Sequence, residues 1–400
     1  MSAAITRAAA LGGRPAVSGN PAPRGSLSRA VFLLTGTAIG AGVYGLPYAF
    51  ARFGMVRAAL ALIILGIAVL GLHLLLGEVV ARTREPLQLP GLGGKYVGVA
   101  AKRLLSLTFL VTSLGALLAY LVGEGEVLQA IWGGKAHVWS LGFWFLVVLC
   151  LSGGLRRVAG LEKFLSSLVM ALLLGLSLLL FTRPAAPSLP ASPAPFSALL
   201  LLYGVAVFSL RAAPAIAEAE AIIPGEPGRL RQAVVLGTLL PLVLYLLFAV
   251  STARVLGGAT PEVATVGLGG VLSPLLARLL NLLPALSMAG AALALGTAVI
   301  DSLRWDWRLP RLGALLVVGG VPLLAYALGA RSFIGILEVV GGIFVGLEAL
   351  ALVLVYQRAR RAGDVSPGAF ALRRPALAIV PIVLIFGGFT LWRLLALVRR

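Results

Sequence analysis

Apolar runs of about 20 residues, separated by short polar or basic segments, dominate the chain after residue 28. An α-helix of that length crosses the hydrocarbon core of a bilayer. Within lipid only helices and closed barrels satisfy every backbone polar group, and the alternation typical of barrel strands is not visible. The pattern predicts eleven membrane-spanning helices, near residues 30–50, 56–81, 104–128, 138–155, 161–181, 196–222, 232–256, 271–303, 311–329, 332–356 and 376–397.

Three stretches fall outside these runs. Residues 1–28 are rich in Ala, Gly, Pro, Ser and Arg and contain no acid. This composition predicts a disordered cytoplasmic tail, and an organelle transit peptide is the alternative. Residues 85–97 are too short and too broken to span, which predicts a cytoplasmic interfacial segment. Residues 183–195 are rich in proline, and we expect them to form an outside loop.

The composition agrees with a lipid-embedded chain. Of the 400 residues, 60% are hydrophobic and 12% are charged, and the mean hydropathy is +1.03. A soluble domain carries about 25% charged residues because its surface must be wet. Cys150 is the only cysteine, so an intrachain disulfide is excluded. Together with two histidines it forms no metal-ligand pattern, and we expect neither a cofactor nor a metal.

The net charge of +19 reflects membrane topology. In a soluble protein such an excess would indicate nucleic acid, but here the basic residues lie mostly between apolar runs. With the N-terminus in the cytoplasm, 22 Lys and Arg residues fall in inside segments and nine in outside segments. The positive-inside rule therefore predicts a multi-pass protein of the inner (cytoplasmic) membrane with a cytoplasmic N-terminus. The last three arginines fit poorly outside.

The first run contains a helix-breaking stretch, Thr35–Pro47, with four glycines and a proline. Such residues weaken a helix, and membranes tolerate irregular backbone only where it lines a protein cavity. A break frees amide donors at the start of the second half-helix, which favours an anion such as a carboxylate. We place this cradle at Gly40, Ala41 and Gly42. Close helix packing through small residues is the alternative.

A second interrupted stretch, Tyr203–Pro214, lies in the sixth run and contains a glycine, a serine, an arginine and a proline. The first and sixth runs are five helices apart. Two broken helices in matching positions of two halves are typical of an inverted-repeat transporter with a binding site at the bilayer midplane. Internal sequence identity between the halves is not visible, so the repeat is inferred from the breaks.

These stretches resemble motifs of the amino acid/auxin permease family, which includes bacterial aromatic amino acid permeases, within the amino acid–polyamine–organocation superfamily. GTAIGAGVYGLPYAFARFG is similar to the family's GTxIGAGIxxLPYA signature, and LGALLAYLVGEGEVL to its G-x-x-x-AY-x-x-G-x-G pattern. Phe208 with PAIAEAE resembles an F-(A/S)-x-x-G-x-x-x-x-PE region. ALALGTAVIDSLRWDWRLP resembles L-x-L-x-x-x-x-D, and VGGIFVGLEALALVLVY resembles GG-x-x-x-G-x-E. The matches follow in order and cover most of residues 30–357.

The resemblance implies an all-α membrane protein with a LeuT-like fold of 5+5 inverted repeats plus one further helix. The repeats would be 29–181 and 182–357, followed by a linker and eleventh helix in 358–400. It also implies alternating-access transport of an amino acid, not an enzyme. The implied substrate-binding residues are Thr37, Gly40, Ala41, Gly42, Tyr44, Tyr120, Val207, Phe208 and Ser209: backbone at 40–42 would hold the carboxylate, and carbonyls at 207–209 would meet the amino group.

The sequence departs from sodium-coupled relatives of this family in its eighth span. Those relatives place a Thr-Ser pair about eleven residues before the aspartate, whereas counting back from Asp301 gives Gly290–Ala291, which have no side-chain oxygen. Sodium needs several hard oxygen ligands, by analogy with other hard cations. We therefore favour coupling to protons, or uncoupled exchange, over sodium; Ser287 could be a ligand in another helix register.

Ionisable residues within the spans are further candidates for coupling. An intramembrane charge indicates a functional site, and for Arg211 three interpretations stay open: it replaces a cation, binds a substrate carboxylate, or pairs with Glu218 or Glu78. Glu218, two helical turns from Arg211, is the preferred protonatable coupling residue. Glu78 can instead pair with Arg82 four residues later, and His73 is either a packed polar residue or a proton carrier.

The favoured function is a secondary amino acid transporter, with an amino acid, protons and membrane lipid as partners, no nucleic acid, and a monomeric state. A nucleobase or inorganic-cation transporter of the same fold is the alternative. A membrane-embedded enzyme would need clustered acids or histidines, and neither a DxxD pair nor an HxxxH pair is present. A channel would need rings of pore residues from an oligomer, and nothing periodic in the sequence indicates one.

Overall fold

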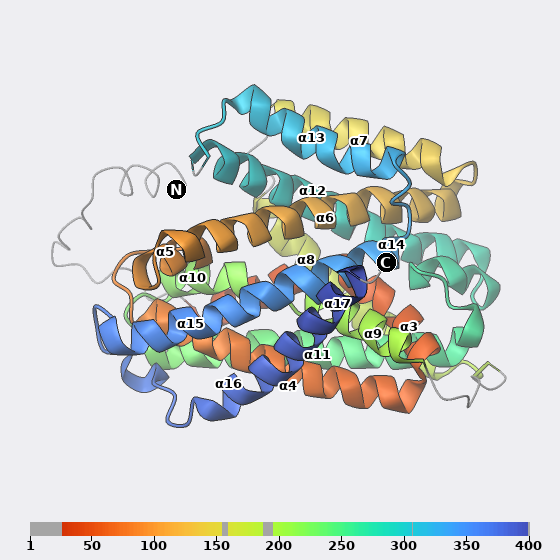
Figure 1. The fold of residues 1–400 in the computed structure, drawn as a ribbon. Helices are drawn as coiled ribbons and strands as arrows, with labels where there is room; N and C mark the ends of the chain where they lie inside the picture. The colour runs from red at the N-terminus through yellow and green to blue at the C-terminus, as the bar shows by residue number, and fades with distance from the viewer. Residues whose placement is uncertain (1–25, 154–158, 187–194, 306, 399–400) are drawn as a thin grey trace.

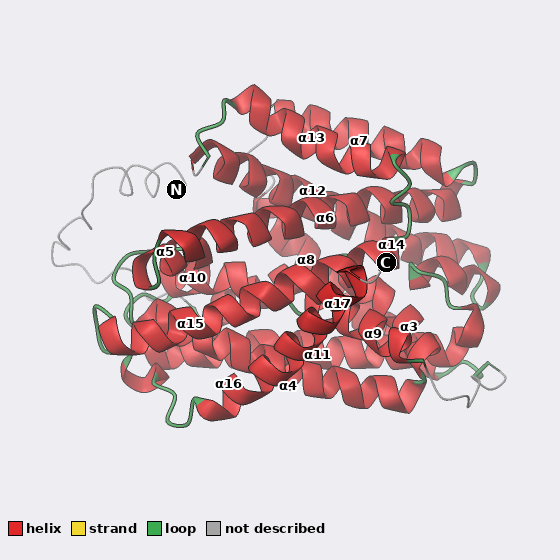
Figure 2. Cartoon of the chain, viewed as in Figure 1, coloured by secondary structure: helices red, strands yellow, loops and turns green. Residues whose placement is uncertain are grey.

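The computed structural model describes residues 26–153, 159–186, 195–305 and 307–398, and these ranges contain helices and loops but no strand (Figure 1, Figure 2). The predicted tail lies almost wholly outside the described residues, as does most of the proline-rich loop. In chain order the elements are α2 (Leu27–Ala38), α3 (Gly42–Phe53), α4 (Met55–Ala81), α5 (Leu89–Tyr96), α6 (Val99–Trp132), α7 (Ala136–Ser152), α8 (Ala159–Phe181), α9 (Phe196–Ser209), α10 (Ala213–Ile222), α11 (Pro227–Leu256), η2 (Gly257–Ala259), η3 (Ala264–Gly270), α12 (Pro274–Trp305), α13 (Arg311–Ala327), α14 (Phe333–Val339), η4 (Val340–Val345), α15 (Gly346–Ala362), η5 (Gly368–Phe370), α16 (Ala376–Ile382), η6 (Val383–Gly387) and α17 (Gly388–Val398).

The helices reproduce the expected series of spans. By length and hydropathy, seven described helices can cross a membrane, and the bent pair α2–α3 makes an eighth. Three shorter apolar helices, α7, the described part of α8, and α13, complete the predicted series. The segment near 85–97 folds as the short helix α5, which confirms that it does not span. Spans one and six are each divided by a non-helical break. Spans ten and eleven each contain a π-helical turn, η4 or η6, between two α-helical segments.

Helix α9 lies at the centre of the bundle and packs against α3 and the π-helical turn η4. The contact is made by backbone. A Cβ atom on Gly204 would lie 2.6 Å from the Glu338 Cα atom, and one on Gly341 would overlap the Gly204 carbonyl oxygen. Small residues at such a crossing let two helices approach closely. Gly204 of the sixth span and Gly341 of the tenth therefore have a packing role.

The end of the bundle that carries α5 is held by an ion pair outside the spans. The Lys95 ammonium lies 2.7 Å from the Asp364 carboxylate, which also accepts the Arg84 amide at 2.9 Å. The hydrogen bond to Asp364 raises the pKa of Lys95, and the hydrogen bond from Lys95 lowers the pKa of Asp364. These bonds attach α5 and the loop before it to the linker after α15.

Glu78 forms a second attachment at the α5 end. Its carboxylate accepts from Arg82 at 2.7 Å, which confirms the predicted pair, and also from the Tyr356 hydroxyl at 3.0 Å and the Leu372 amide at 2.9 Å. Glu78 is fully buried. A buried carboxylate is stable only when it is paired and hydrogen-bonded, so this residue has a structural role that joins α4, α15 and the segment before α16.

The opposite end of the bundle, which carries η3, is closed by a different carboxylate. Glu262, in the loop before η3, accepts the Ser332 hydroxyl at 2.9 Å and the Ile334 amide at 3.0 Å. The first amides of a helix have no partner within the helix, and here the Glu262 side chain supplies one for α14. The loop is thereby fixed over the start of the tenth span.

Candidate functional site: a chamber between two broken helices

Both predicted helix breaks are present. Between α2 and α3 the chain is non-helical from Ile39 to Ala41, and the two helices differ in direction by 57°. Between α9 and α10 the chain is non-helical from Leu210 to Ala212. Pro214 stands at the start of α10, where its missing amide hydrogen is tolerated. The breaks therefore lie where glycine or proline weakens the helix.

The two breaks touch each other. A Cβ atom on Gly42, the first residue of α3, would lie 2.9 Å from the Ser209 Cα atom at the end of α9 and would overlap the Ser209 hydroxyl. Real Cβ atoms do not approach backbone this closely, so only glycine fits at this position. The four half-helix ends consequently meet at one place in the membrane.

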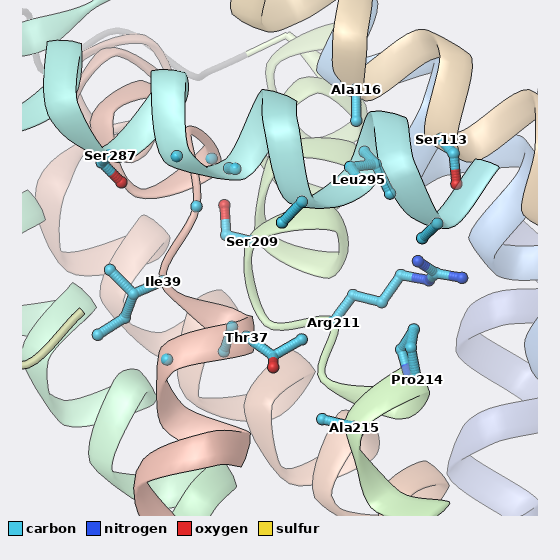
Figure 3. A pocket seen from close by; sticks show the side chains of 18 of the residues that line it. Thr37, Ile39, Ser113, Ala116, Ser209, Arg211, Pro214, Ala215, Ser287 and Leu295 are labelled. Carbon is cyan, nitrogen blue, oxygen red and sulfur yellow. The ribbon is translucent and has the colours of Figure 1, made fainter. Parts of the chain in front are cut away.

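A chamber of about 380 Å³ begins at the breaks and extends toward the α5 end of the bundle. Figure 3 shows Thr37, Ser209, Arg211 and Ser287 around it. Its walls come mainly from α2, α6, the α9–α10 region and α12, with one residue each from α3 and α8. Glu218 is exposed at the α5 end. The predicted site residues that line it are Thr37, Gly40, Gly42, Tyr120, Phe208, Ser209, Arg211 and Glu218.

Three predicted binding residues do not line the chamber in this conformation. Ala41 and Tyr44 are fully buried, and Val207 is nearly so and borders a much smaller cavity next to Arg211. The Tyr44 ring packs edge-on against Phe248, on the η3 side of the break. These three residues lie close behind the chamber wall. The sequence could not predict this, because it does not show in which direction each side chain points.

The amides of the first break are only partly available. The Gly40 amide donates to the Ala38 carbonyl at 2.9 Å in a tight turn, so it is already satisfied. The Ala41 and Gly42 amides donate to no other group in the described part of the chain. They stand at the start of α3, where the helix dipole favours an anion. Of the three predicted anion-binding amides, those of Ala41 and Gly42 therefore remain as donors. Gly40 contributes only to the wall of the chamber.

The carbonyls of the two breaks share one hydroxyl donor. The Tyr245 hydroxyl, from α11, lies 2.7 Å from the Ala38 carbonyl oxygen and 3.2 Å from the Ser209 carbonyl oxygen. Tyr245 is fully buried. The single Tyr245 hydroxyl group therefore serves as donor to the last carbonyl of α2 and to the last carbonyl of α9. The sequence did not identify this residue, because the contact joins positions 207 residues apart.

Replacing Tyr245 with phenylalanine should destabilise the protein by about 1–3 kcal/mol, because buried carbonyls lose their donor. The measurement is thermal unfolding of the purified protein in detergent. Tyr203→Phe is the matched control, since the Tyr203 hydroxyl is buried near Thr390 without a well-formed hydrogen bond. Equal unfolding temperatures for the two variants would show that the Tyr245 hydroxyl does not hold the breaks together.

Arg211 pairs with a residue that the sequence did not predict. Its Nη2 atom lies 3.0 Å and 3.1 Å from the two Glu348 carboxylate oxygens, on α15. Of the two expected partners, Glu78 was wrong, because it binds Arg82. Glu218 lies exposed on α10. The Arg211 Nε atom is buried, and no hydrogen-bond partner meets it within the described part of the chain. The guanidinium extends toward Ser113 at the chamber wall (Figure 3), so part of it stays available to a ligand.

His73 is held in one neutral tautomer by its hydrogen bonds. The Thr238 hydroxyl donates to the Val234 carbonyl at 2.8 Å, so it must accept from His73 Nδ1 at 2.9 Å. The other ring nitrogen, Nε2, accepts the Ala212 amide at 3.3 Å. A protonated ring would have no acceptor for Ala212. The geometry supports the interpretation of His73 as a packed polar residue that fixes the second break.

The sequence of residues 24–267 matches the profile of the tryptophan/tyrosine permease family, which is more than half of the chain. The chain belongs to the tryptophan/tyrosine permease family. This agrees with the resemblance seen in the motifs. None of the curated proteins matches the sequence of this permease.

Solved structures match the permease over most of its length. It is similar to MhsT in complex with L-phenylalanine, with a TM-score of 0.63, 16% identity, and coverage of 92% of this chain and 100% of that one. It is similar to Mhp1 in an inward-facing conformation, with a TM-score of 0.55, 16% identity, and coverage of 84% and 79%. A manganese transporter of Eremococcus coleocola matches with a TM-score of 0.60, 16% identity, and coverage of 95% and 89%. The permease therefore has the predicted LeuT-like fold.

Proposed function

We propose that this permease is a secondary active transporter that moves an amino acid across the cytoplasmic membrane by alternating access. The observation that carries the proposal is the contact between the two helix breaks at one chamber, through Gly42 and Ser209. A chamber that extends to one end of the bundle and is closed at the other suits a carrier that exposes its site to one side at a time.

In this proposal the substrate is bound as a zwitterion by the backbone of the breaks. The carboxylate meets the amides of Ala41 and Gly42, where the α3 dipole adds a favourable field. The amino group meets carbonyls at the end of α9, from Val207 to Ser209. Thr37, Tyr44, Tyr120 and Phe208 surround the side chain. Small movements of the half-helices would bring Tyr44 and Val207 into the wall.

An aromatic amino acid is the substrate class that the comparisons favour. The family description refers to tryptophan and tyrosine, and the similar MhsT structure holds L-phenylalanine. A volume of about 380 Å³ is within the range of sites that enclose small ligands, about 300–1,000 Å³. The aromatic rings of Tyr120 and Phe208 at the wall suit stacking or edge contacts with such a side chain.

Protons, rather than sodium, are the proposed coupling ion. Gly290 and Ala291 border the chamber at the place where sodium-coupled relatives carry hydroxyl side chains, and neither has a side-chain oxygen. Arg211, which is paired with Glu348, already supplies a guanidinium at the same chamber. Glu218, exposed at the α5 end, is a protonatable group in contact with the chamber.

The proposed orientation has the N-terminus and α5 in the cytoplasm, so this conformation is open inward and closed outward. The inside segments carry 22 of the Lys and Arg residues and the outside segments nine, which follows the positive-inside rule. The proposal also takes the protein to act as a monomer.

Uptake into proteoliposomes tests the function. A panel of labelled amino acids is offered with an imposed pH gradient, and separately with a sodium gradient. We expect saturable uptake and counterflow of aromatic amino acids, driven by the pH gradient and indifferent to sodium. Sodium-dependent uptake that ignores pH would contradict the coupling proposal, and uptake of uracil or Mn²⁺ without any amino acid would favour the nucleobase or cation transporters that share this fold.

A further inference from the structure

A buried carboxyl group lies just outside the chamber, on the closed η3 side. Glu124, on α6, is 3% exposed, and its Oε2 atom has no hydrogen-bond partner in the described part of the chain. It stands one helical turn beyond Tyr120, which lines the chamber. The other buried acids differ, because Glu78 pairs with Arg82 and Glu348 with Arg211.

No described cation faces Glu124 to balance a charge. Its electrostatic neighbour is Tyr44 on α3, whose own hydroxyl lies near Ser287 of α12 without a well-formed hydrogen bond. Glu126, two residues further along α6, has Glu262 as its electrostatic neighbour. Both are acids, so neither supplies a positive charge that could balance Glu124. An ionised carboxylate buried without a partner costs several kcal/mol. Glu124 is therefore neutral, and carries a proton, in this conformation.

Several buried oxygens on elements that contact η3 have no hydrogen-bond partner in the described part of the chain. Buried side-chain oxygens without a hydrogen-bond partner occur on Tyr44, Thr252, Thr265 and Asn281, as well as on Glu124. Their elements, α3, α6, α11, α12 and η3 itself, all meet at η3. Each such atom costs about 1–3 kcal/mol when it is kept from water. These unsatisfied atoms are explained if another conformation of the protein hydrates the η3 end of the bundle.

We propose that Glu124 is a proton-binding site whose occupation is required for the η3 end to close. When that end is open, water reaches the carboxylate, which exchanges its proton with the solution on that side. Closure removes the water, so the carboxylate must first bind a proton and become a carboxylic acid. This inference rests on the proposed transport function and deepens it. It assigns Glu124 as the group through which the pH of the solution on the η3 side controls closure of that end.

Infrared spectroscopy of the purified protein tests the protonation state without any substrate. Wild type at neutral pH should show the carbonyl-stretch band of a buried protonated carboxyl group, and Glu124→Gln should lose it. Glu85→Gln is the control and should keep the band, because Glu85 is exposed outside the spans. Absence of the band in wild type, or its persistence in Glu124→Gln, would overturn the assignment.

Exchange of labelled against unlabelled amino acid in proteoliposomes tests the role in closure. Wild-type exchange should fall as the pH on the η3 side rises, whereas Glu124→Gln, a permanent mimic of the protonated acid, should exchange at all pH values. Glu124→Asp should restore the dependence. A Gln variant that retains the wild-type pH profile, or that is folded but inactive, would overturn the proposal. If wild type exchanges no amino acid but shows the infrared band, the proposed function fails while the protonated site stands.

Discussion

Replacing Gly42 with leucine should abolish transport, and alanine at this position should already reduce it roughly ten- to hundredfold. The added Cβ atom would lie 2.9 Å from the Ser209 Cα atom, which belongs to backbone and cannot rotate away. Overpacking of this kind costs about 1–3 kcal/mol, and each 1.4 kcal/mol is a factor of ten. The breaks would be forced apart at the point where the substrate carboxylate is proposed to bind. The measurement is initial uptake by proteoliposomes with matched protein content.

Gly40→Ala is the matched control for Gly42. The Cβ atom that alanine adds at Gly40 meets only the Tyr120 hydroxyl, at the ordinary contact distance of 3.5 Å. The variant should keep its fold and lose little transport. If Gly40→Ala and Gly42→Ala were equally active, the close contact between the two breaks would have no functional role.

Replacing Arg211 with alanine should destabilise the protein by about 3–5 kcal/mol, because Glu348 is then left as a buried, uncompensated charge. Glu348 is 6% exposed, and its carboxylate lies 3.0 Å from the Arg211 guanidinium. The double variant Arg211→Ala/Glu348→Gln removes the charge as well as its partner. It should recover most of the lost unfolding temperature, which is measured in detergent.

Transport by the double variant separates the interpretations of Arg211. If Arg211 serves only as the partner of Glu348, the double variant should recover transport together with stability. If its buried Nε atom and the rest of the guanidinium act on the substrate or replace a cation, stability should return while uptake stays low. We expect the second result, because Arg211 lines the chamber and its Nε atom makes no hydrogen bond among the described residues. Full recovery of uptake would contradict this expectation.

The membrane spans could be predicted from sequence because bilayer thickness fixes helix length. The run near 56–81 became α4, Met55–Ala81, and the run near 311–329 became α13, Arg311–Ala327. The breaks could also be predicted, since glycine and proline act locally on the backbone. The division into repeats at 29–181 and 182–357 stays a prediction.

The side-chain contacts of the site could not be predicted in the same way. The partner of Arg211 lies 137 positions along the chain, and only packing of the tenth span, through α14 and η4, against α9 brings the two together. The single hydroxyl of Tyr245, which serves both breaks, depends on the approach of three helices. Glu124 did carry a sequence signal, an acid inside an apolar run, but nothing local shows that its Oε2 atom lacks a partner.

Competition binding to the purified protein tests most directly whether the backbone of the two breaks binds a zwitterion. Labelled L-tryptophan is displaced by unlabelled L-tryptophan, by tryptamine, which lacks the carboxylate, or by indole-3-propionate, which lacks the amino group. We predict displacement by L-tryptophan, little displacement by either analogue, and loss of binding in Gly42→Leu. Equal displacement by tryptamine, or unchanged binding in Gly42→Leu, would contradict the proposal that the half-helix ends bind both charges of the substrate.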